Sequence, residues 1–138
     1  MAIWLLKTEP SAYSYDDLER DGNTMWDGVT QPHALQNIRK MEKGDLAVIY
    51  HTGDERAAVG IAEVTRGYYV NPEQDDPKLA VCDVRAKERL PRQVTLSEIK
   101  THPQLKDWDL VRLARLSVVP VSEEQWRILQ AMARREKQ

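Results

Sequence analysis

Short apolar runs that end at turn-forming residues recur along the chain and predict strands. The run Ile3–Lys7 stops at Glu9-Pro10, which is typical of a strand with a sharp end. Leu46–Tyr50 and Val59–Val64 flank a glycine-bearing turn, so we expect these two segments to pair as an antiparallel hairpin. The first of the two is apolar on both faces, which predicts a strand that is buried on both sides.

Two further strands and one long loop are expected after the hairpin. Residues 79–90 alternate, with Ala80, Cys82, Val84 and Ala86 on one face and charged residues on the other, which predicts a half-exposed strand. Residues 68–78 are rich in Asn, Pro and Asp, which favours a loop. Residues 113–121 should form the last strand and stop near Pro120.

Capping patterns predict most of the helices. In a capping box, a hydroxyl residue and an acid or amide three positions later each bond the other's backbone N–H. This pattern occurs at Ser14–Asp17, Thr95–Glu98 and Ser122–Gln125. It predicts one helix that ends at Gly22, a second over Leu96–Thr101 and a terminal helix from Glu123 on. A further helix is expected at Pro32–Met41, with the proline in its first turn.

Strands and helices mix without the strict alternation of a parallel α/β protein. The pattern therefore predicts an α+β fold, in which a small mixed or antiparallel sheet curls into a barrel and helices flank it. A length of 138 residues and the lack of a linker or internal repeat predict a single domain over residues 1–138. We expect this domain to be a monomer.

Composition narrows the class of protein. Hydrophobic residues make up 41% and charged residues 30% of the chain, which is typical of a folded globular protein. No apolar run approaches the ~20 residues of a membrane helix, and the start of the chain resembles a strand rather than a signal peptide. The single cysteine excludes an internal disulfide, so we expect a cytoplasmic protein with no membrane partner.

The sequence carries no recognisable catalytic or metal-binding motif. Cys82 lies on the apolar face of its predicted strand, where a thiol stays protonated. His33, His51 and His102 lack metal-ligand spacing, and no phosphate loop or dinucleotide glycine pattern is present. We therefore expect no metal, no cofactor and no enzymatic activity.

Polar residues gather where two of the predicted strands end. If the strands are neighbours, these residues converge and suit a flat hydrogen-bonding ligand. They are Lys7, Thr8, Glu9, Tyr50, His51 and Thr52. The alternative is that the threonines satisfy turn backbone and Tyr50 packs in the core. A catalytic alternative would use Glu9 and His51 as an acid–base pair on a common ligand.

The position of one tryptophan is a second indication of a ligand-binding site. Trp26 precedes the turn dipeptide Asp27-Gly28, where a large aromatic is either a core plug or the wall of a pocket. Trp4 should lie in the core. Trp126 should be buried against the barrel, because it repeats at helical spacing with Leu129 and Ala133 on the terminal helix. Trp108 is expected to be either a lid or a packed loop residue.

Several motifs in the same order resemble the EVE domain family. They are "WLLKTEP", "YSYDDL", "MWDGV", "MEKGDLAVIYHTGDERAAVGIAEV" and "RLSVVPV", and together they extend over essentially the whole chain. The resemblance implies a PUA-like fold, related to YTH domains and to thymocyte nuclear protein 1. It also implies a non-enzymatic domain that binds a modified base in RNA or DNA.

The resemblance further implies the residues of the site. Trp26 matches an aromatic cage wall, and the motif around it continues through Asp27, Gly28 and Val29. The strand ends named above match other pocket segments, as do Arg115 and Ser117. One segment departs from the family pattern, because residues 30–37 are "TQPHALQN" where many members have "RNYQARN".

The net charge of the chain is compatible with a second class of ligand, a free nucleoside-like molecule. A net charge of −2 argues against an extended grip on phosphates, although it does not exclude a single base held in a pocket. The partner expected from the sequence is therefore a modified nucleic acid, RNA or DNA. The alternative partner is a free nucleoside-like small molecule.

Overall fold

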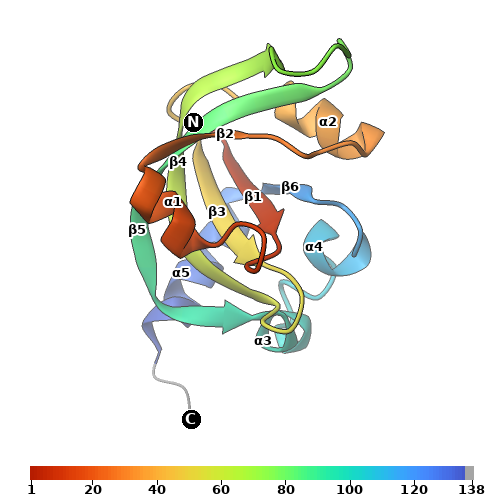
Figure 1. The fold of residues 1–138 in the computed structure, drawn as a ribbon. Coiled ribbons are helices and arrows are strands. Elements are labelled where there is room, and N and C mark those ends of the chain that lie inside the picture. The colour runs from red at the N-terminus through yellow and green to blue at the C-terminus, as the bar shows by residue number, and fades with distance from the viewer. Residues whose placement is uncertain (136–138) are drawn as a thin grey trace.

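Six strands hydrogen-bond into one curled mixed sheet in the computed structural model, which describes residues 1–135 (Figure 1). The spatial order is β2-β5-β4-β3-β1-β6. The strands are β1 (Ile3–Thr8), β2 (Asn23–Trp26), β3 (Leu46–His51), β4 (Ala57–Val70), β5 (Ala80–Thr95) and β6 (Val118–Val121). The expected α+β fold is confirmed; the last three residues of the expected 1–138 domain lie outside the described residues.

Pairing within the sheet is antiparallel except between β1 and β3. The expected hairpin is confirmed, because Leu46 pairs with Glu63 and Val48 with Ile61 across β3 and β4. β1 lies parallel to β3, with Leu5 opposite Val48. This parallel pair places the polar ends of β1 and β3 side by side, as Thr8 is opposite His51.

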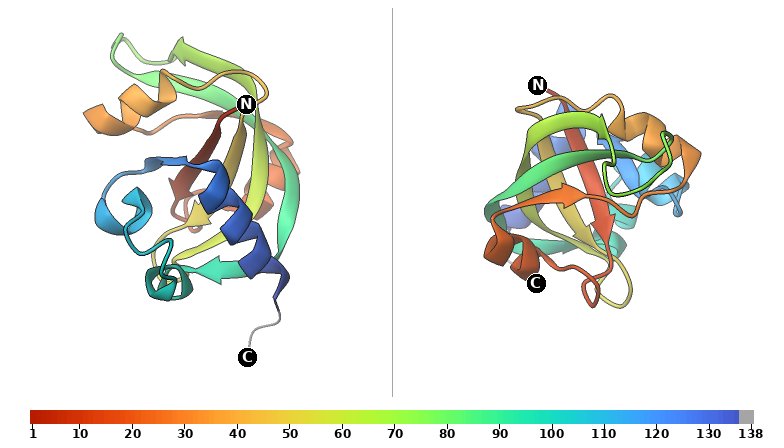
Figure 2. Two further views of the ribbon diagram at one scale, coloured as in Figure 1. Left: turned by 180° about the vertical axis from the view of Figure 1, so that it is seen from behind. Right: turned by 45° about the horizontal axis from the view of Figure 1, so that its top comes forward.

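The two longest strands bend the sheet. β4 and β5 span 14 and 16 residues, and their register shifts at several points along the pair. Such irregularities bend a ribbon and increase its twist. β5 therefore carries β2 around toward the opposite edge of the sheet, so that the edge strands β2 and β6 border a gap in the curled sheet (Figure 2).

Helices cover the outside of the curled sheet (Figure 2). They are α1 (Tyr15–Asp21), α2 (Pro32–Ile38), α3 (Leu96–Thr101), α4 (Asp109–Arg112) and α5 (Glu123–Arg134). The three predicted capping boxes, at Ser14, Thr95 and Ser122, are all present. α5 packs against β5, and α2 packs against β5 and β6. Within residues 1–135, none of the helices combines the length and the apolar character that crossing a membrane requires.

Several predicted boundaries were wrong. The segment before the Asp27-Gly28 turn is the strand β2, because it pairs with an open edge of β5. The second helix ends at Ile38 rather than Met41, and part of the expected loop, Tyr68–Val70, belongs to β4. Helix α4 was not predicted. Pro120 lies inside β6, where an edge strand tolerates a missing N–H.

Buried side chains from every strand form one core. As expected, Trp4 is part of it, and its indole donates to the buried Asp45 carboxylate at 3.1 Å. Trp108 proves to be a packed residue whose indole donates to the Pro120 carbonyl at 3.0 Å. The expectation for Trp126 was wrong, because this side chain is only partly buried, while Leu129 on the same helix is fully buried.

One close contact fixes helix α1 to the sheet. Tyr15 is fully buried, and its hydroxyl donates to the Ile61 carbonyl of β4 at 2.7 Å. Its ring lies directly over Gly60, where an added Cβ would come within 2.6 Å of ring atoms. Gly60 therefore provides the space in which the tyrosine can pack, and α1 is held at a defined position on β4.

We predict that Gly60→Ala destabilises the protein by about 1–3 kcal/mol, because the new methyl group overpacks the Tyr15 ring. Urea unfolding measures the loss. The double variant Gly60→Ala/Tyr15→Leu supplies the control, since removing the ring removes the clash. Its loss of stability should be smaller than the sum of the two single losses. Strict additivity would contradict this account of the contact.

Candidate ligand-binding pocket

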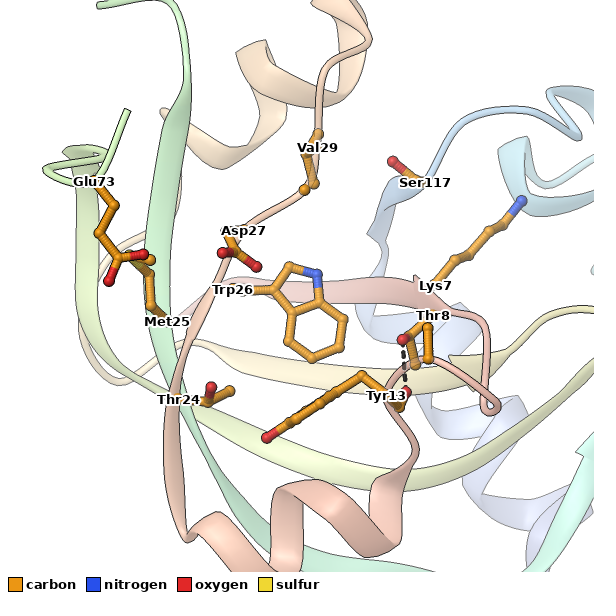
Figure 3. Close-up of a pocket in the computed structure, with 12 residues that line it drawn as sticks. Lys7, Thr8, Tyr13, Thr24, Met25, Trp26, Asp27, Val29, Glu73 and Ser117 are labelled. Carbon is orange, nitrogen blue, oxygen red and sulfur yellow. Dashed lines mark hydrogen bonds between the residues drawn. The ribbon is translucent and has the colours of Figure 1, made fainter. Parts of the chain in front are cut away.

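A cavity of about 570 Å³ opens where the two edges of the curled sheet approach each other. One wall comes from β2 and the turn that follows it, and the other comes from the end of β1 and the residue before β6 (Figure 3). The lining residues are Lys7, Thr8, Ala12, Tyr13, Thr24, Met25, Trp26, Asp27, Gly28, Val29, Glu73 and Ser117.

Trp26 forms the aromatic wall of the cavity. It is the last residue of β2, where pairing with Cys82 of β5 fixes its backbone. The side chain is 6% exposed, yet it lines the cavity rather than being enclosed on all sides. Its indole N–H makes no hydrogen bond within residues 1–135. Every fully buried side-chain nitrogen or oxygen in these residues does have a partner, so this unbonded N–H is not fully buried. The N–H therefore reaches the open space of the cavity.

Tyr13 meets Trp26 at a right angle. The ring centroids are 6.2 Å apart and the planes cross at 83°. The Tyr13 hydroxyl donates to Asp21 at 2.8 Å, and burial raises its pKa, so the phenol stays neutral. The Tyr13 carbonyl accepts a hydrogen bond from Thr8 Oγ1 at 2.7 Å, which fixes the Tyr13 backbone to the end of β1. The rings form a corner against which a flat ligand can lie.

Among residues 1–135, Lys7 supplies the only cation of the lining, but its ammonium is turned away from Trp26 (Figure 3). The Lys7 ammonium donates to the Ala114 carbonyl at 2.9 Å and lies 5.9 Å from the centre of the Tyr50 ring. Burial lowers the pKa of Lys7 from its ordinary value of 10.5. Lys7 therefore bonds the protein's own backbone instead of presenting a free charge to a ligand.

Two carboxylates face the cavity from the other side. Asp27 follows Trp26 directly, and Glu73 comes from the loop between β4 and β5 (Figure 3). Both side chains are exposed, and neither carboxylate is hydrogen-bonded or ion-paired within residues 1–135. Each carboxylate can therefore accept a hydrogen bond from a ligand N–H group.

Seven of the predicted site residues line this cavity. They are Lys7, Thr8, Trp26, Asp27, Gly28, Val29 and Ser117. The other five do not line it: Glu9, Tyr50, His51, Thr52 and Arg115. The expectation that the end of β3 lines the same cavity as Trp26 was therefore wrong. A role of any of these residues in binding stays a prediction.

The end of β3 has a structural role instead. His51 is buried and accepts the Tyr15 backbone N–H at Nε2, 3.0 Å away, while its Nδ1 lies 2.9 Å from the Glu55 carboxylate. Thr52 donates its backbone N–H to the Thr8 carbonyl at 2.9 Å. Tyr50 is 3% exposed and packs in the core. These contacts hold β1, α1 and the hairpin together.

Glu9, His51 and Cys82, the residues considered for catalysis, do not lie together at the cavity beside Trp26. The Glu9 carboxylate accepts from the backbone and the hydroxyl of Ser11, at 3.2 and 3.1 Å, and lies against Gly53. Glu9 and His51 therefore share no open ligand space in the cavity beside Trp26. Cys82 is fully buried with its thiol 3.5 Å from the Met41 sulfur, and burial raises the thiol pKa to about 12.

Five lining residues were missed by the sequence-based prediction: Ala12, Tyr13, Thr24, Met25 and Glu73. Thr24 and Met25 belong to β2, which was not predicted as a strand. Tyr13 could have been found, because it lies one residue before a clear helix cap. No sequence pattern around Glu73 indicates a site residue, because its loop reaches the cavity only through the way in which β4 and β5 bend.

Fold and site together define a class of protein, a PUA-like domain with an aromatic-walled pocket. The model of the EVE domain matches residues 2–132, and the chain therefore belongs to the EVE domain family. This confirms the resemblance seen in the sequence. An ASCH protein from Zymomonas mobilis, with a TM-score of 0.59 at 10% identity over 96% of this chain and 99% of its own, shares the fold alone.

Relatives extend over almost the whole chain. Thymocyte nuclear protein 1 of Gallus gallus is 31% identical over 89% of this chain, which spans 65% of that protein's length. The solution structure of Rpa0253 from Rhodopseudomonas palustris is 36% identical with a TM-score of 0.91, covering 96% of this chain and 93% of that one. The human THYN1 protein, solved in complex with DNA containing 5-methylcytosine, is 26% identical with a TM-score of 0.91, covering 99% and 100%.

We predict that the Lys7 amine titrates below 10.5, because burial disfavours its charged form. This lowered pKa makes the free energy of unfolding depend on pH. The buried ammonium opposes folding below its folded pKa, and this opposition is relieved as the pH rises from the folded pKa to the unfolded value. An NMR titration of the lysine Nζ and Cε signals, assigned with Lys7→Met, measures the pKa. A midpoint at or above 10.5 would contradict the burial.

Proposed function

We propose that this domain binds a modified nucleobase of a nucleic acid in the cavity beside Trp26, without acting on it chemically. One observation carries the proposal: Trp26 is buried in the fold but opens onto a cavity, with its indole N–H free to donate. A volume of about 570 Å³ falls within the ~300–1,000 Å³ typical of small-molecule pockets.

The chemistry of the lining suits a base. Every base has a π-face, and stacking on an aromatic side chain contributes ~1–3 kcal/mol per base. Hydrogen-bonding edges of a base stacked on the indole face can meet the Ser117 hydroxyl and the Asp27 carboxylate, while the indole N–H, which points along the ring plane, can donate to a part of the ligand beside the stacked base. A methyl group adds only ~0.8 kcal/mol of apolar burial, so selectivity for a modified base depends on how the polar groups fit.

Family membership supports the same proposal. The human THYN1 protein, which shares the fold over nearly the whole chain, has been solved with DNA that contains 5-methylcytosine. Binding of DNA that contains a modified base by a protein of the same fold supports a modified base as the ligand proposed for this chain. The identity of the base in this chain follows from its own lining. The segment 30–37, which departs from the family pattern, follows the lining residue Val29 directly but does not itself line the cavity.

A free nucleoside is the second candidate ligand. The net charge of −2 and the two lining carboxylates favour it, because they weaken attraction to a phosphate backbone. Salt dependence separates the two candidates, since polymer binding releases counterions and nucleoside binding does not.

We predict that Trp26→Leu weakens binding of a 5-methylcytosine oligonucleotide about tenfold or more, because it removes the stacking face while keeping an apolar side chain. Isothermal titration calorimetry measures the affinity, and circular dichroism verifies folding. Trp126→Leu is the matched control, since Trp126 is half-buried on α5 and does not line the cavity. Equal affinities for the folded Trp26→Leu variant and the wild type would exclude this cavity as the site.

We also predict a shallow salt dependence for the oligonucleotide, with a slope of log K against log salt between about −1 and −2. Each phosphate contact contributes about −0.7 to −0.9, and the cavity rim offers few free cations. Arg115 is exposed and lies two residues before Ser117, so it should contact one phosphate. Arg115→Ala should therefore make the slope shallower by about one, and the control Arg127→Ala on α5 should leave the slope unchanged. A slope of zero, together with equal affinity for the free nucleoside, would favour the second candidate.

A further inference from the structure

The charges that line the cavity are unbalanced. Its titratable lining consists of the Lys7 ammonium, the Tyr13 phenol and the carboxylates of Asp27 and Glu73. The phenol is neutral, because burial raises its pKa. One ammonium against two carboxylates leaves an excess of one negative charge. The ammonium is moreover bonded to the Ala114 carbonyl, so the groups free to meet a ligand are both anionic.

The loop that carries Glu73 strengthens this negative field. Residues 71–79, between β4 and β5, also contain Asp75, Asp76 and Lys78, all exposed. Three acids against one lysine leave the loop with a net charge of −2. Arg39, the residue that follows α2, donates from its guanidinium to the Lys78 carbonyl at 2.8 Å, and its positive charge offsets one of the two excess negative charges of the loop. The cavity mouth is therefore acidic.

Aromatic faces next to carboxylates form a recognisable combination. A cation over an indole ring is attracted by the negative π-face, and tryptophan is the strongest such partner. The rings of Trp26 and Tyr13 stand at 83° to each other, so they can contact a ligand on two sides. Asp27 follows Trp26 directly along the chain, which places a negative charge beside the aromatic face (Figure 3).

We propose that the cavity selects nucleobases that carry a positive charge, as ring-N-methylated adenine and cytosine do near neutral pH, over their neutral methylated isomers. This inference rests on the proposed function, because it specifies the class of base that the same cavity binds. A cationic base stacks on Trp26 with a cation–π contribution that a neutral base lacks. Its charge also offsets the Asp27 and Glu73 carboxylates, and its N–H groups can donate to Asp27, which lies beside Trp26 (Figure 3).

Isomer pairs test the inference without changing the size or composition of the ligand. 1-Methyladenosine is cationic near neutral pH, while N6-methyladenosine is neutral. 3-Methylcytidine is cationic, while 5-methylcytidine is neutral. We expect the cationic member of at least one pair to bind the full chain tenfold or more tightly than its isomer at pH 7, as measured by calorimetry.

Variants test whether the carboxylates carry the preference. In Asp27→Asn and Glu73→Gln the ratio of the two affinities should fall toward one, and the double variant should lower it further. Glu88→Gln is the matched control, because Glu88 is an exposed carboxylate of β5 that neither lines the cavity nor belongs to the acidic loop 71–79, and it should keep the ratio.

The outcomes separate the inference from the function on which it rests. If neutral isomers bind as tightly as cationic ones or more tightly, the cavity still binds bases and the charge inference is overturned. If the preference is present but survives in the double variant, the assignment to Asp27 and Glu73 is overturned. If no member of either pair and no modified oligonucleotide binds, the proposed function falls and the charge inference falls with it.

Discussion

The bend of the β4–β5 ribbon is the constraint on which the site depends. Repeated register shifts turn the two longest strands, and β5 carries β2 toward the side of the sheet where β1 and β6 lie. Without this bend, Trp26 would lie on the edge of an open sheet, far from Thr8 and Ser117. The cavity is the space that remains where the curled sheet does not close, so Trp26 lines it from one side and Thr8 and Ser117 line it from the other.

A second set of contacts fixes the corner of the cavity. His51 accepts the first N–H of α1, the Tyr15 ring fills the space over Gly60, and Thr8 bonds the Tyr13 carbonyl. The first two contacts join segments that are distant in sequence, and the third fixes the turn between β1 and α1. Together they hold Tyr13 against Trp26, which explains why residues at the end of β3 can matter for the site although they do not line it.

Local sequence signals predicted the elements better than the site. Capping boxes at Ser14, Thr95 and Ser122 fixed the helix starts, because capping depends on residues three positions apart. β2 was missed because it owes its strand conformation to pairing with β5, about sixty residues further on. His51 was expected in the pocket because its strand end is polar. Its actual partners, the Tyr15 N–H and Glu55, depend on where α1 docks, which no local pattern encodes.

The chain's four tryptophans allow a direct test of the central claim, that Trp26 presents an open face and a free N–H to a base. The indole N–H groups of Trp4 and Trp108 are bonded inside the fold, and Trp126 lies on α5 outside the cavity lining. We therefore expect that titrating a modified-base oligonucleotide shifts the Trp26 indole signal in ¹H–¹⁵N NMR spectra and leaves the other three in place. Saturable binding that leaves Trp26 unchanged while another indole shifts would contradict the account.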